Sequence, residues 1–364
     1  MKNKRKKILI LTNHSYMLYR FRKELIEELM KDNEVILSMP FVGHHEDFID
    51  MGIRCIETKM ERRGINPFTD FSLMKFYKKI LKDEKPDLVI TYSIKPNIYG
   101  GLMCSKLKIP FYANVQGLGT AFQKKGLAEF VTLLYKTAFK KVETVFFENQ
   151  VNADEFTNRN IISAEKETVL NGAGINLEAY EYKPFPFNEP PRFLYLGRIM
   201  KEKGMDELFE ASERLHNDGE SFVLDLVGFF EDEYKEKVDQ LVEKGIVEFH
   251  GFQEEPRPYY AKADCVVMPS YHEGMSNVNL EASATGRPVI TTDIPGCRES
   301  IENEKTGWLC ESKNTDSLYD KMKAFLNTEP AVREEMGKNA RSKMEAEFDK
   351  KVVVKQTIKA LGLE

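Results

Sequence analysis

The sequence predicts an α/β protein with two Rossmann-like, doubly wound domains that face a central cleft. Its length is the first observation: 364 residues, at roughly 150 per domain, correspond to two domains. Short apolar runs alternate with helical periods in two series, and a proline-rich break separates the series. The composition, with 42% hydrophobic and 30% charged residues, is that of a globular protein and excludes wholesale disorder and fibrous structure.

The first series of apolar runs lies in residues 1–180. Runs this short are typical of parallel strands that are buried on both faces. We expect strands at Ile8–Leu11, Val35–Ser38, Leu88–Thr91, Phe111–Val115, Thr144–Phe147 and Thr168–Leu170. Phe21, Leu25 and Leu29 recur every fourth residue after the first strand, and residues 73–80 show a similar period, so we expect helices there.

The break follows at residues 181–192, where four of twelve residues are proline. Proline lacks the N–H that helices and strands need, so this segment is expected to link a domain of residues 1–180 to one of residues 193–364. The second series predicts strands at Phe193–Leu196, Val223–Val227, Val247–His250, Cys265–Met268 and Val289–Thr292. Alternating strands and helices form parallel sheets. The last helical stretch, residues 339–363, can pack on either domain.

Several classes of protein are excluded. No apolar run approaches the roughly 18–20 residues of a membrane-spanning helix. The basic N-terminus leads into the short apolar run Ile8–Leu11, which is shorter than the roughly 7–15 residues of a secretory signal. The five cysteines are scattered and lack zinc spacing, which favours a reduced, cytoplasmic compartment. The GxG at residues 172–174 lacks the third glycine of a dinucleotide fingerprint, and we interpret it as an interdomain turn.

The charge is uneven along the chain. Residues 1–180 hold 28 Lys and Arg against 22 Asp and Glu, whereas the remainder holds 25 against 36, for a formal total of −5. The basic half is the candidate to face a phosphate-bearing ligand or a lipid surface, although solvated faces also produce such imbalances. No nucleic-acid partner is expected.

A pair of glutamates, Glu273 and Glu281, gives the strongest local signal. Glu273 would lie in the loop at the carboxyl end of a strand, and Asn277 would begin a helix just after Gly274 and Ser276. The free backbone N–H groups at that helix start form an anion site. Glu281 would lie on the same helix face as Asn277 and could accept hydrogen bonds from a ribose. A glutamate pair at this spacing is also common on solvated surfaces, so it does not identify a site alone.

A basic loop, Gly197 to Gly204, follows the first strand of the second series. Arg198 offers a planar fork for phosphate oxygens, Lys203 offers a point charge, and the glycines permit close backbone approach. A solvated turn is the alternative. Two cations at a strand end in an acidic domain nevertheless favour a site for a diphosphate.

Together, the two segments resemble the retaining glycosyltransferases of family 4, which have the GT-B fold. The E-x7-E element of that family matches Glu273–Glu281, and its G-R-x-x-x-x-K-G stretch matches Gly197–Gly204. Flanking residues agree as well: Ala263-Asp264, Pro269-Ser270, Gly286-Arg287-Pro288-Val289-Ile290 and Gly307-Trp308-Leu309. The resemblance covers the whole C-terminal half.

The resemblance implies a role for each residue. Lys203 and Arg198 would hold the donor diphosphate, Glu281 would bind the ribose, Glu273 would contact the donor sugar, and the chain near Phe252 would approach the base. Catalytic roles are therefore expected for Glu273, Lys203 and Arg198. The expected donor site comprises Gly197, Arg198, Lys203, Phe252, Glu273, Gly274, Met275, Ser276, Asn277 and Glu281.

The N-terminal half is similar to the branch that builds lipid-linked oligosaccharides, and within it to N-acetylgalactosaminyltransferases acting on undecaprenyl-diphosphate sugars. The matching stretches are Tyr19-Arg20-Phe21-Arg22, Arg63-Gly64-Ile65-Asn66-Pro67-Phe68, Gln116-Gly117-Leu118-Gly119-Thr120 and Gly174-Ile175-Asn176-Leu177. Contacts to the acceptor or the sugar are expected from His14, which follows the first strand, and from Tyr19, Arg20, Gln116 and Gly117.

Two positions depart from the family pattern. The loop of residues 12–17 lacks the Gly-Gly pair with which many members touch the donor phosphates. Similar enzymes have glutamate where this chain has Gln116. Because glutamine cannot act as a general base, we expect Gln116 to position the acceptor or the sugar.

No metal or other cofactor is expected. The chain has no Asp-x-Asp element, and its six histidines form no ligand cluster in the sequence. Arg198, Lys203 and a helix N-terminus can neutralise a leaving diphosphate without a metal ion.

The segment Gln123–Lys141 reads as a basic amphipathic helix. It holds five lysines against Glu129, and its apolar residues recur at helical spacing. Such a helix can lie on an anionic bilayer, and each nearby Lys adds about 1 kcal/mol there. A core-facing helix with solvated lysines is the alternative; the lipid-linked acceptor that the resemblance implies favours the membrane.

The resemblance thus implies a cytoplasmic hexosyltransferase, peripheral on the inner face of the membrane. It would move GalNAc or GlcNAc from a UDP-sugar, with retention, to an undecaprenyl-diphosphate-linked saccharide in surface polysaccharide or glycan biosynthesis. Two alternatives remain open: a nucleotide-sugar epimerase on the same fold, and a non-catalytic nucleotide-sugar-binding module.

Overall fold

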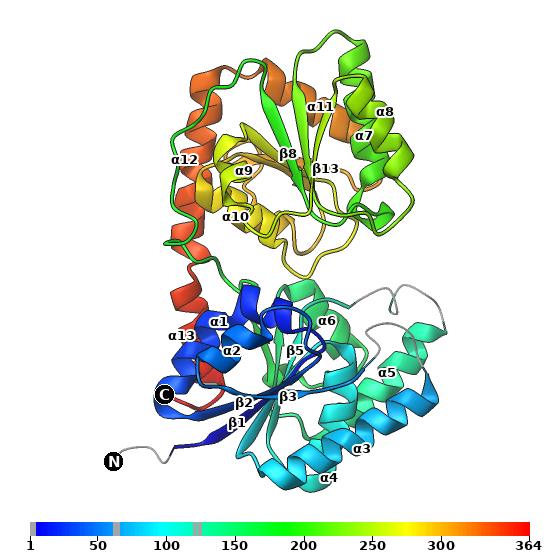
Figure 1. The fold of residues 1–364 in the computed structure, drawn as a ribbon, viewed down its shortest axis with the longest axis vertical. Helices are drawn as coiled ribbons and strands as arrows, with labels where there is room; N and C mark the ends of the chain where they lie inside the picture. The colour runs from blue at the N-terminus through cyan, green and yellow to red at the C-terminus, as the bar shows by residue number, and fades with distance from the viewer. Residues whose placement is uncertain (1–4, 61–65, 119–121, 123–125) are drawn as a thin grey trace. The chain divides into compact units, whose positions relative to one another are not determined.

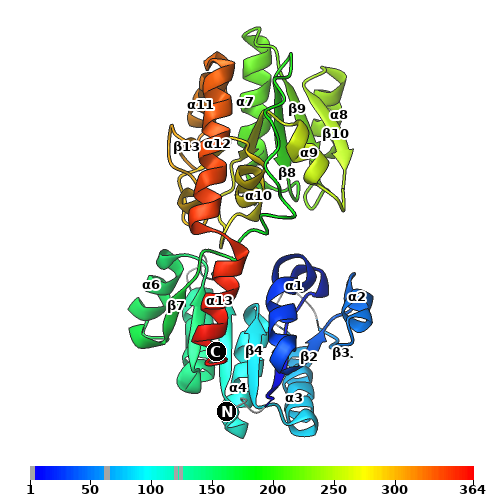
Figure 2. The ribbon, with the colours of Figure 1, turned by 90° about the vertical axis from the view of Figure 1, so that its left-hand side faces the viewer.

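The computed structural model describes residues 5–60, 66–118, 122 and 126–364. The chain divides into two compact units: unit 1 is Met1–Ala173 with Val352–Glu364, and unit 2 is Gly174–Lys351. In each unit a parallel sheet lies between layers of helices (Figures 1 and 2). The predicted fold class of two doubly wound α/β units is confirmed.

Unit 1 has a sheet of seven parallel strands in the order β3-β2-β1-β4-β5-β6-β7. Their bounds are β1 Lys7–Leu11, β2 Glu34–Met39, β3 Arg54–Glu57, β4 Leu88–Tyr92, β5 Phe111–Val115, β6 Thr144–Phe147 and β7 Glu167–Val169. All six predicted strands are present, and β3 is added at one edge. The central strand β1 pairs with β2 and β4, with Ile8 opposite both Val35 and Leu88.

Helices cover both faces of this sheet. They are α1 Ser15–Asp32, α2 His45–Asp50, α3 Pro67–Glu84, α4 Gly101–Leu107, α5 Leu127–Ala138, α6 Gln150–Asn158 and α13 Lys350–Ala360. Successive strand residues point to opposite faces. Leu9 therefore packs in one core with Tyr77 of α3 and Tyr135 of α5, whereas Ile8 packs in another with Leu25 of α1 and Val353 of α13.

Unit 2 has six parallel strands in the order β10-β9-β8-β11-β12-β13. Their bounds are β8 Arg192–Leu196, β9 Val223–Val227, β10 Val247–Gly251, β11 Cys265–Met268, β12 Val289–Thr292 and β13 Gly307–Cys310. The five predicted strands are all present, and β13 is added, again at an edge.

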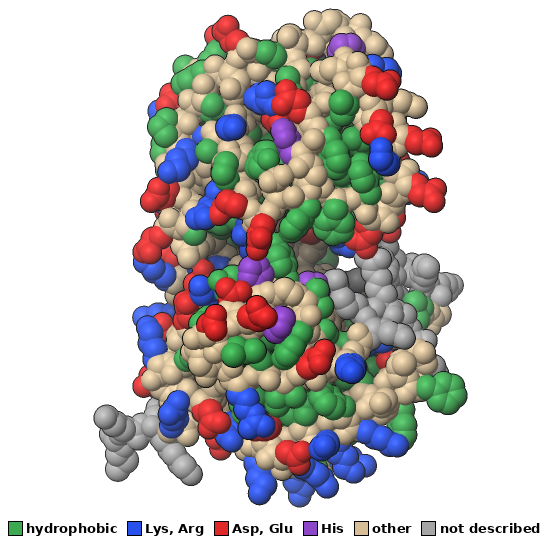
Figure 3. Space-filling model, in the orientation of Figure 1, with side chains coloured by type: hydrophobic (Ala, Val, Ile, Leu, Met, Phe, Trp, Pro, Cys, Tyr) green, Lys and Arg blue, Asp and Glu red, His purple; other side chains and the backbone are tan. Residues whose placement is uncertain are grey.

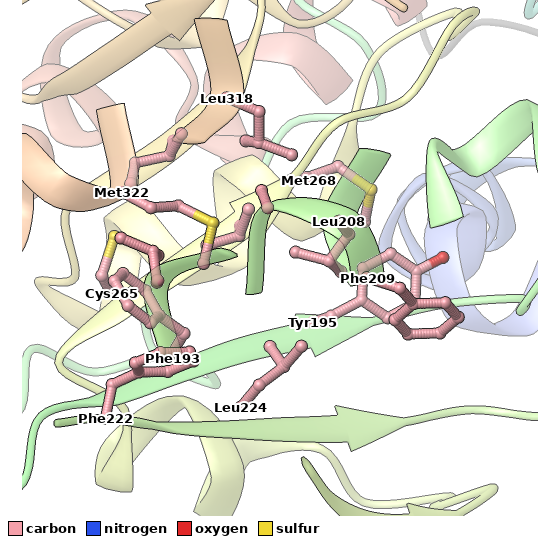
Figure 4. Close-up of a cluster of buried hydrophobic side chains, with 14 of the residues drawn as sticks. Phe193, Tyr195, Leu208, Phe209, Phe222, Leu224, Cys265, Met268, Leu318 and Met322 are labelled. Carbon is pink, nitrogen blue, oxygen red and sulfur yellow. The ribbon is translucent and has the colours of Figure 1, made fainter. Parts of the chain in front are cut away.

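The helices of unit 2 are α7 Met205–Asn217, α8 Lys235–Glu243, α9 Arg257–Lys262, α10 Asn277–Thr285, α11 Thr315–Asn327 and α12 Pro330–Glu347. The core on one face of the sheet joins Phe193 and Tyr195 of β8 to Leu208 of α7 and Met322 of α11 (Figure 4). Leu194, pointing the other way, packs with residues of α9, α10 and α12.

The chain crosses between the units at two places. The first crossing lies between Ala173 and Gly174, at the predicted interdomain turn and ahead of the proline-rich segment 181–192. That segment belongs to unit 2, where the buried guanidinium of Arg287 donates to the carbonyls of Lys183, at 2.9 Å, and Pro184, at 3.0 Å.

The second crossing follows the break between α12 and α13. The predicted stretch 339–363 is therefore two helices: α12 packs in unit 2, and α13 carries Val353 into the core of unit 1. The backbone N–H of Ile175 donates to Phe348 O at 2.8 Å, and that of Lys350 donates to Ile175 O at 3.0 Å. These bonds hold the two crossing segments side by side.

Among the residues that the structure describes, no helix is both long enough and apolar enough to cross a membrane.

Candidate active site

The loop after β8 carries the predicted cations of unit 2. It ends at Gly204, which has φ +74°, and a Cβ there would lie 2.1 Å from the carbonyl oxygen of Pro269. A side chain cannot occupy that position, so glycine is required. The close approach sets Lys203 beside the loop that joins β11 to α10.

Lys203 forms an ion pair with Glu273 on that neighbouring loop, between Nζ and Oε1. The side chains are 16% and 15% exposed. Gly296 holds the backbone of the second loop close, because a Cβ there would lie 2.7 Å from Glu273 O and 2.6 Å from Gly274 O. The structure thus brings together two of the three predicted catalytic residues, in a charge-assisted bond.

The third residue, Arg198, pairs with Glu231, which the sequence analysis missed. The distance from Arg198 Nη1 to Glu231 Oε2 is 2.8 Å. The hydroxyl of Tyr195 donates to the carbonyl of Arg198 at 2.6 Å and fixes its backbone. Burial, with the nearby Glu273 charge, raises the pKa of Tyr195 well above its usual value, so this hydroxyl keeps its proton.

The start of α10 lies directly after the Glu273 loop, as predicted. Ser276 caps the helix: its side chain accepts from Asn279 N at 3.4 Å, and its own N–H donates to Gly296 O at 2.7 Å. Met275, also a predicted site residue, is buried. Asn277 begins the helix, whose first-turn N–H groups have no partners within the helix, so this end attracts anions.

Glu281 lies one turn into α10 and is 6% exposed. One of its oxygens, Oε2, accepts a hydrogen bond of 2.8 Å from the hydroxyl of Tyr260, a fully buried residue of α9. The tyrosine therefore fixes the orientation of the carboxylate that was predicted to bind a ribose.

Two exposed aromatic rings follow β9 and β10. Phe252, a predicted site residue, is 55% exposed, and Phe229, which the sequence analysis missed, is 46% exposed. Their ring centroids lie 6.1 Å apart in an edge-to-face arrangement. Two neighbouring exposed rings form an aromatic surface that can stack on a planar ligand.

The predicted contact residues of unit 1 lie at strand ends and on α1. His14 caps α1, its Nδ1 accepting from Met17 N at 3.4 Å, and Gln116 Nε2 lies 3.5 Å from Met17 Sδ. Tyr19 stacks on the ring of His44 with the centroids 4.4 Å apart. Arg20 lies on α1 and Gly117 just after β5. His14 and Gln116 thus contact the same methionine, His14 at its backbone and Gln116 at its side chain.

A buried ion pair in unit 1 was also missed. Arg22 Nη2 donates to Glu148 Oε1 at 2.7 Å, and the side chains are 8% and 12% exposed. Both line a small cavity with Gln116 and Gly172, at the carboxyl ends of β5 and β6. Ligands of doubly wound sheets bind at these strand ends.

Among the described residues, two carboxylates and a histidine in unit 2 lie close enough together to hold a metal ion. Ligand atoms of Asp225, Glu248 and His250 lie within 4.8 Å of one another. Arg192 donates to both carboxylates, with 2.6 Å to Asp225 Oδ1 and 2.5 Å to Glu248 Oε2. The guanidinium supplies the positive charge that a metal ion would bring, so this group is an ion-pair network of the sheet.

Parts of the predicted motifs lie outside the described residues. These are Arg63, Gly64 and Ile65, Gly119 and Thr120, and residues 123–125 at the start of the predicted membrane segment.

Comparison with known protein families gives two matches, one for each half of the chain. Residues 7–149 match the model described as "Glycosyl transferase 4-like", and residues 178–343 match "Glycosyl transferases group 1". The second match contains every predicted residue of the donor site.

Two curated relatives cover most of the chain. An N-acetylgalactosaminyltransferase of Campylobacter jejuni, named for its acceptor N,N'-diacetylbacillosaminyl-diphospho-undecaprenol, is 28% identical over 97% of both chains. A capsular polysaccharide biosynthesis glycosyltransferase of Staphylococcus aureus is 26% identical over 80% of both.

Solved structures share the fold over the whole length. The HepE protein of Anabaena, in complex with UDP and glucose, has a TM-score of 0.80 at 16% identity and covers 98% of this chain and 99% of its own. A sucrose-phosphate synthase of Thermosynechococcus elongatus has a TM-score of 0.76 at 20% identity and covers 98% of both.

Proposed function

We propose that this chain, which belongs to the group 1 glycosyltransferases and has the GT-B fold, is a retaining hexosyltransferase that uses a UDP-sugar donor. One observation carries the proposal: Arg198 and Lys203 lie at the carboxyl end of β8, each beside a carboxylate, and the start of α10 follows the loop that Lys203 contacts. That arrangement matches a ligand with a diphosphate and a sugar.

The donor would be UDP-GalNAc or UDP-GlcNAc. Glu281 would accept hydrogen bonds from the ribose, and Phe252 with Phe229 would meet the planar base. Glu273 would orient the sugar hydroxyls while Lys203 turns toward the phosphate oxygens. The UDP bound in the HepE structure supports this choice of nucleotide.

The reaction breaks the bond between the anomeric carbon and the diphosphate oxygen. The electron pair leaves with UDP, a hydroxyl of the acceptor forms the new bond on the same face of the sugar, and the proton of that hydroxyl passes to the diphosphate oxygen that leaves. Arg198, Lys203 and the N–H groups of α10 would stabilise the charge that develops on the leaving diphosphate. Removal of one such donor typically costs about 100- to 1000-fold in kcat. In this proposal these groups replace a metal ion.

The acceptor would be a saccharide on undecaprenyl diphosphate. Support comes from the likeness, over 97% of both chains, to the Campylobacter enzyme whose name specifies that carrier. His14 and Gln116 follow strands of unit 1 and both contact Met17, and Tyr19, Arg20 and Gly117 are near them along the chain. These polar groups suit the hydroxyl and acetamido groups of an acceptor sugar.

A lipid-linked acceptor lies in a membrane, so the enzyme must reach the membrane surface. In unit 1, α5 and α3 carry exposed apolar and basic side chains that can bind it. On α5, Phe130 and Leu133 are exposed, and Lys136, Lys140 and Lys141 follow. On α3, Phe68 and Phe71 are exposed, with four lysines further along the helix. Figure 3 shows basic and hydrophobic side chains together over the part of unit 1 where Figure 1 places α3. We infer peripheral binding to the inner face of the cytoplasmic membrane.

Thermal unfolding with nucleotides tests the donor site. UDP at 100 times its Kd should add about 2.7 kcal/mol, and EDTA should not change the shift. GDP, ADP, CMP and NAD are the controls. A shift with NAD alone, or a UDP shift that EDTA removes, would contradict the proposal.

Product analysis then tests the reaction. The purified chain should release UDP from UDP-GalNAc or UDP-GlcNAc only when a lipid-diphosphate saccharide is present. Conversion of the donor without acceptor would indicate an epimerase, and UDP-sugar binding without turnover with any such acceptor would indicate a binding module.

A further inference from the structure

The loop after β9, residues 228–232, is paired with the loop that carries Arg198. Ile199 N donates to Phe229 O at 2.9 Å, and Glu231 N donates to Ile199 O at 3.1 Å. Ile199 and Phe230 form a parallel bridge. The ladder between β8 and β9 therefore continues beyond both strand ends, so the same hydrogen bonds place the backbones of Arg198 and Glu231.

Close packing also fixes the two loops. A Cβ on Gly228 would lie 1.8 Å from Gly197 O, and the side chain of Ile199 is fully buried. Lys201 N donates to Asp232 Oδ2 at 2.8 Å. These contacts hold the loops together without the Glu231 carboxylate, so its removal leaves their packing in place.

The carboxylate acts on the guanidinium of Arg198. Glu231 Oε2 accepts a hydrogen bond of 2.8 Å from Arg198 Nη1. The Glu231 and Arg198 side chains are 21% and 40% exposed. A guanidinium is planar and rigid, so one fixed nitrogen and a fixed backbone set the direction of its other N–H groups. The Tyr195 hydroxyl supplies the backbone constraint.

We infer that Glu231 is a positioning residue, which holds the Arg198 guanidinium so that its remaining N–H groups face the leaving diphosphate of the donor. The inference rests on the proposed function, because it needs a diphosphate at Arg198. Positioning of this kind contributes mainly to turnover, since a misplacement of about 1 Å at a reacting group can cost about 100-fold in rate.

A double-mutant cycle in the full-length protein tests the inference. The variants are Glu231→Ala, Glu231→Gln, Arg198→Ala and the double Arg198→Ala/Glu231→Ala. The matched control is Glu233→Ala, which removes the same charge from an exposed position two residues further along the chain. For each variant, kcat, KM for the UDP-sugar, the Kd values of UDP and UMP, and Tm are measured.

We expect Glu231→Ala to lower kcat by up to about 100-fold at an unchanged Tm, and to reduce the preference for UDP over UMP. Glu231→Gln, whose amide oxygen still accepts from Nη1, should recover most of the activity. The double variant should be no slower than Arg198→Ala alone, because Glu231 acts through Arg198. Glu233→Ala should match the wild type.

Multiplicative losses in the double variant would overturn the inference, and so would a Glu231→Ala variant with wild-type kcat beside an impaired Arg198→Ala. A drop in Tm that accounts for the loss in rate would assign Glu231 to the fold alone. If Arg198→Ala itself kept full activity and UDP affinity, the proposed function of the loop would fail, which is a distinct result.

Discussion

At the scale of single residues, the site depends on paired charges and on positions without side chains. Lys203 and Arg198 each meet a carboxylate from a different loop. Gly204 and Gly296 let those loops approach to distances that a Cβ would prevent. Charge and backbone geometry together keep the cations in place before any ligand arrives.

Replacement of Lys203 by alanine should lower turnover by about 100- to 1000-fold while the protein still folds, because in the proposed reaction the leaving diphosphate would lose a positive partner. Initial rates with a UDP-sugar and acceptor measure the effect, and thermal unfolding checks the fold. Lys201→Ala is the matched control, since Lys201 lies on the same loop with a side chain that is 68% exposed. Wild-type turnover in Lys203→Ala would refute the assignment.

The sequence predicted the residues whose neighbours along the chain form a pattern. Gly197 to Gly204 and Glu273 to Glu281 are such patterns. Glu231 and Phe229 were missed because their partners, Arg198 and Phe252, come from other loops. One signal was available: Gly228 directly follows a predicted strand, and the carboxyl ends of neighbouring parallel strands meet at one edge of a sheet.

At the scale of helices and strands, the two missed strands are both sheet edges. β3, Arg54–Glu57, and β13, Gly307–Cys310, each end the order of their sheet. Apolar runs reveal strands buried on both faces. Arg54 and Glu57 are exposed, so β3 lacks the continuous apolar run. The break in the last helical stretch was also missed, since no glycine or proline marks it; the available signal was Asp349, whose side chain accepts from Lys351 N at 2.8 Å at the start of α13.

An ion pair network between α7 and the α8 region makes the stability of the folded protein depend on pH. Hydrogen bonds from Lys237 and Lys244 lower the pKa of Glu213 in the folded protein. Its contribution is therefore present above the unfolded pKa of about 4.3 and is lost as the pH falls through the lower, folded value. Glu213→Gln should destabilise by about 1 kcal/mol or less at pH 7, because the pair is partly exposed.

Urea unfolding of Glu213→Gln and wild type at pH 7 and near pH 4 measures this link. The difference in free energy of unfolding should shrink at the lower pH. Glu233→Gln, an exposed position before α8, serves as the control. A difference that grew on acidification would contradict the assignment.

The surface of α3 and α5 should bind anionic vesicles at low ionic strength. Leu133→Glu and Phe71→Glu each place a negative charge at an exposed apolar position, which should release the protein to the supernatant. Val242→Glu, at an exposed position on α8 of unit 2, should sediment like the wild type. A wild-type protein that stays in the supernatant would contradict the membrane proposal.

At the scale of the whole molecule, unit 2 is inserted into the chain of unit 1, which residues 352–364 complete. The proline-rich segment 181–192 did not mark the division, because Arg287 ties it to unit 2. Composition shows where a chain is irregular, but tertiary hydrogen bonds decide to which unit an irregular segment belongs.

Adjacent valines at the start of α13 test this division. Val353 is 4% exposed in the core of unit 1, and Val352 is 50% exposed. Val353→Asp should destabilise unit 1 by about 2–4 kcal/mol, because it buries a charge, whereas Val352→Asp should change stability by less than about 0.5 kcal/mol. Hydrogen exchange should report faster exchange in β1 and β2, with unit 2 unchanged. Equal effects of the two substitutions would contradict the packing of α13.

The insertion has a consequence for biosynthesis. A ribosome makes the chain from its N-terminal side, so residues 352–364 emerge after all of unit 2. Unit 2 can reach its native state while its ends are held by the bonds of Ile175 to Phe348 and Lys350. The core of unit 1 stays incomplete until Val353 and Leu361 are synthesised, because these side chains pack in the same core as Ile8 and Leu25. The nascent chain therefore completes unit 2 before unit 1, although synthesis of unit 1 begins first.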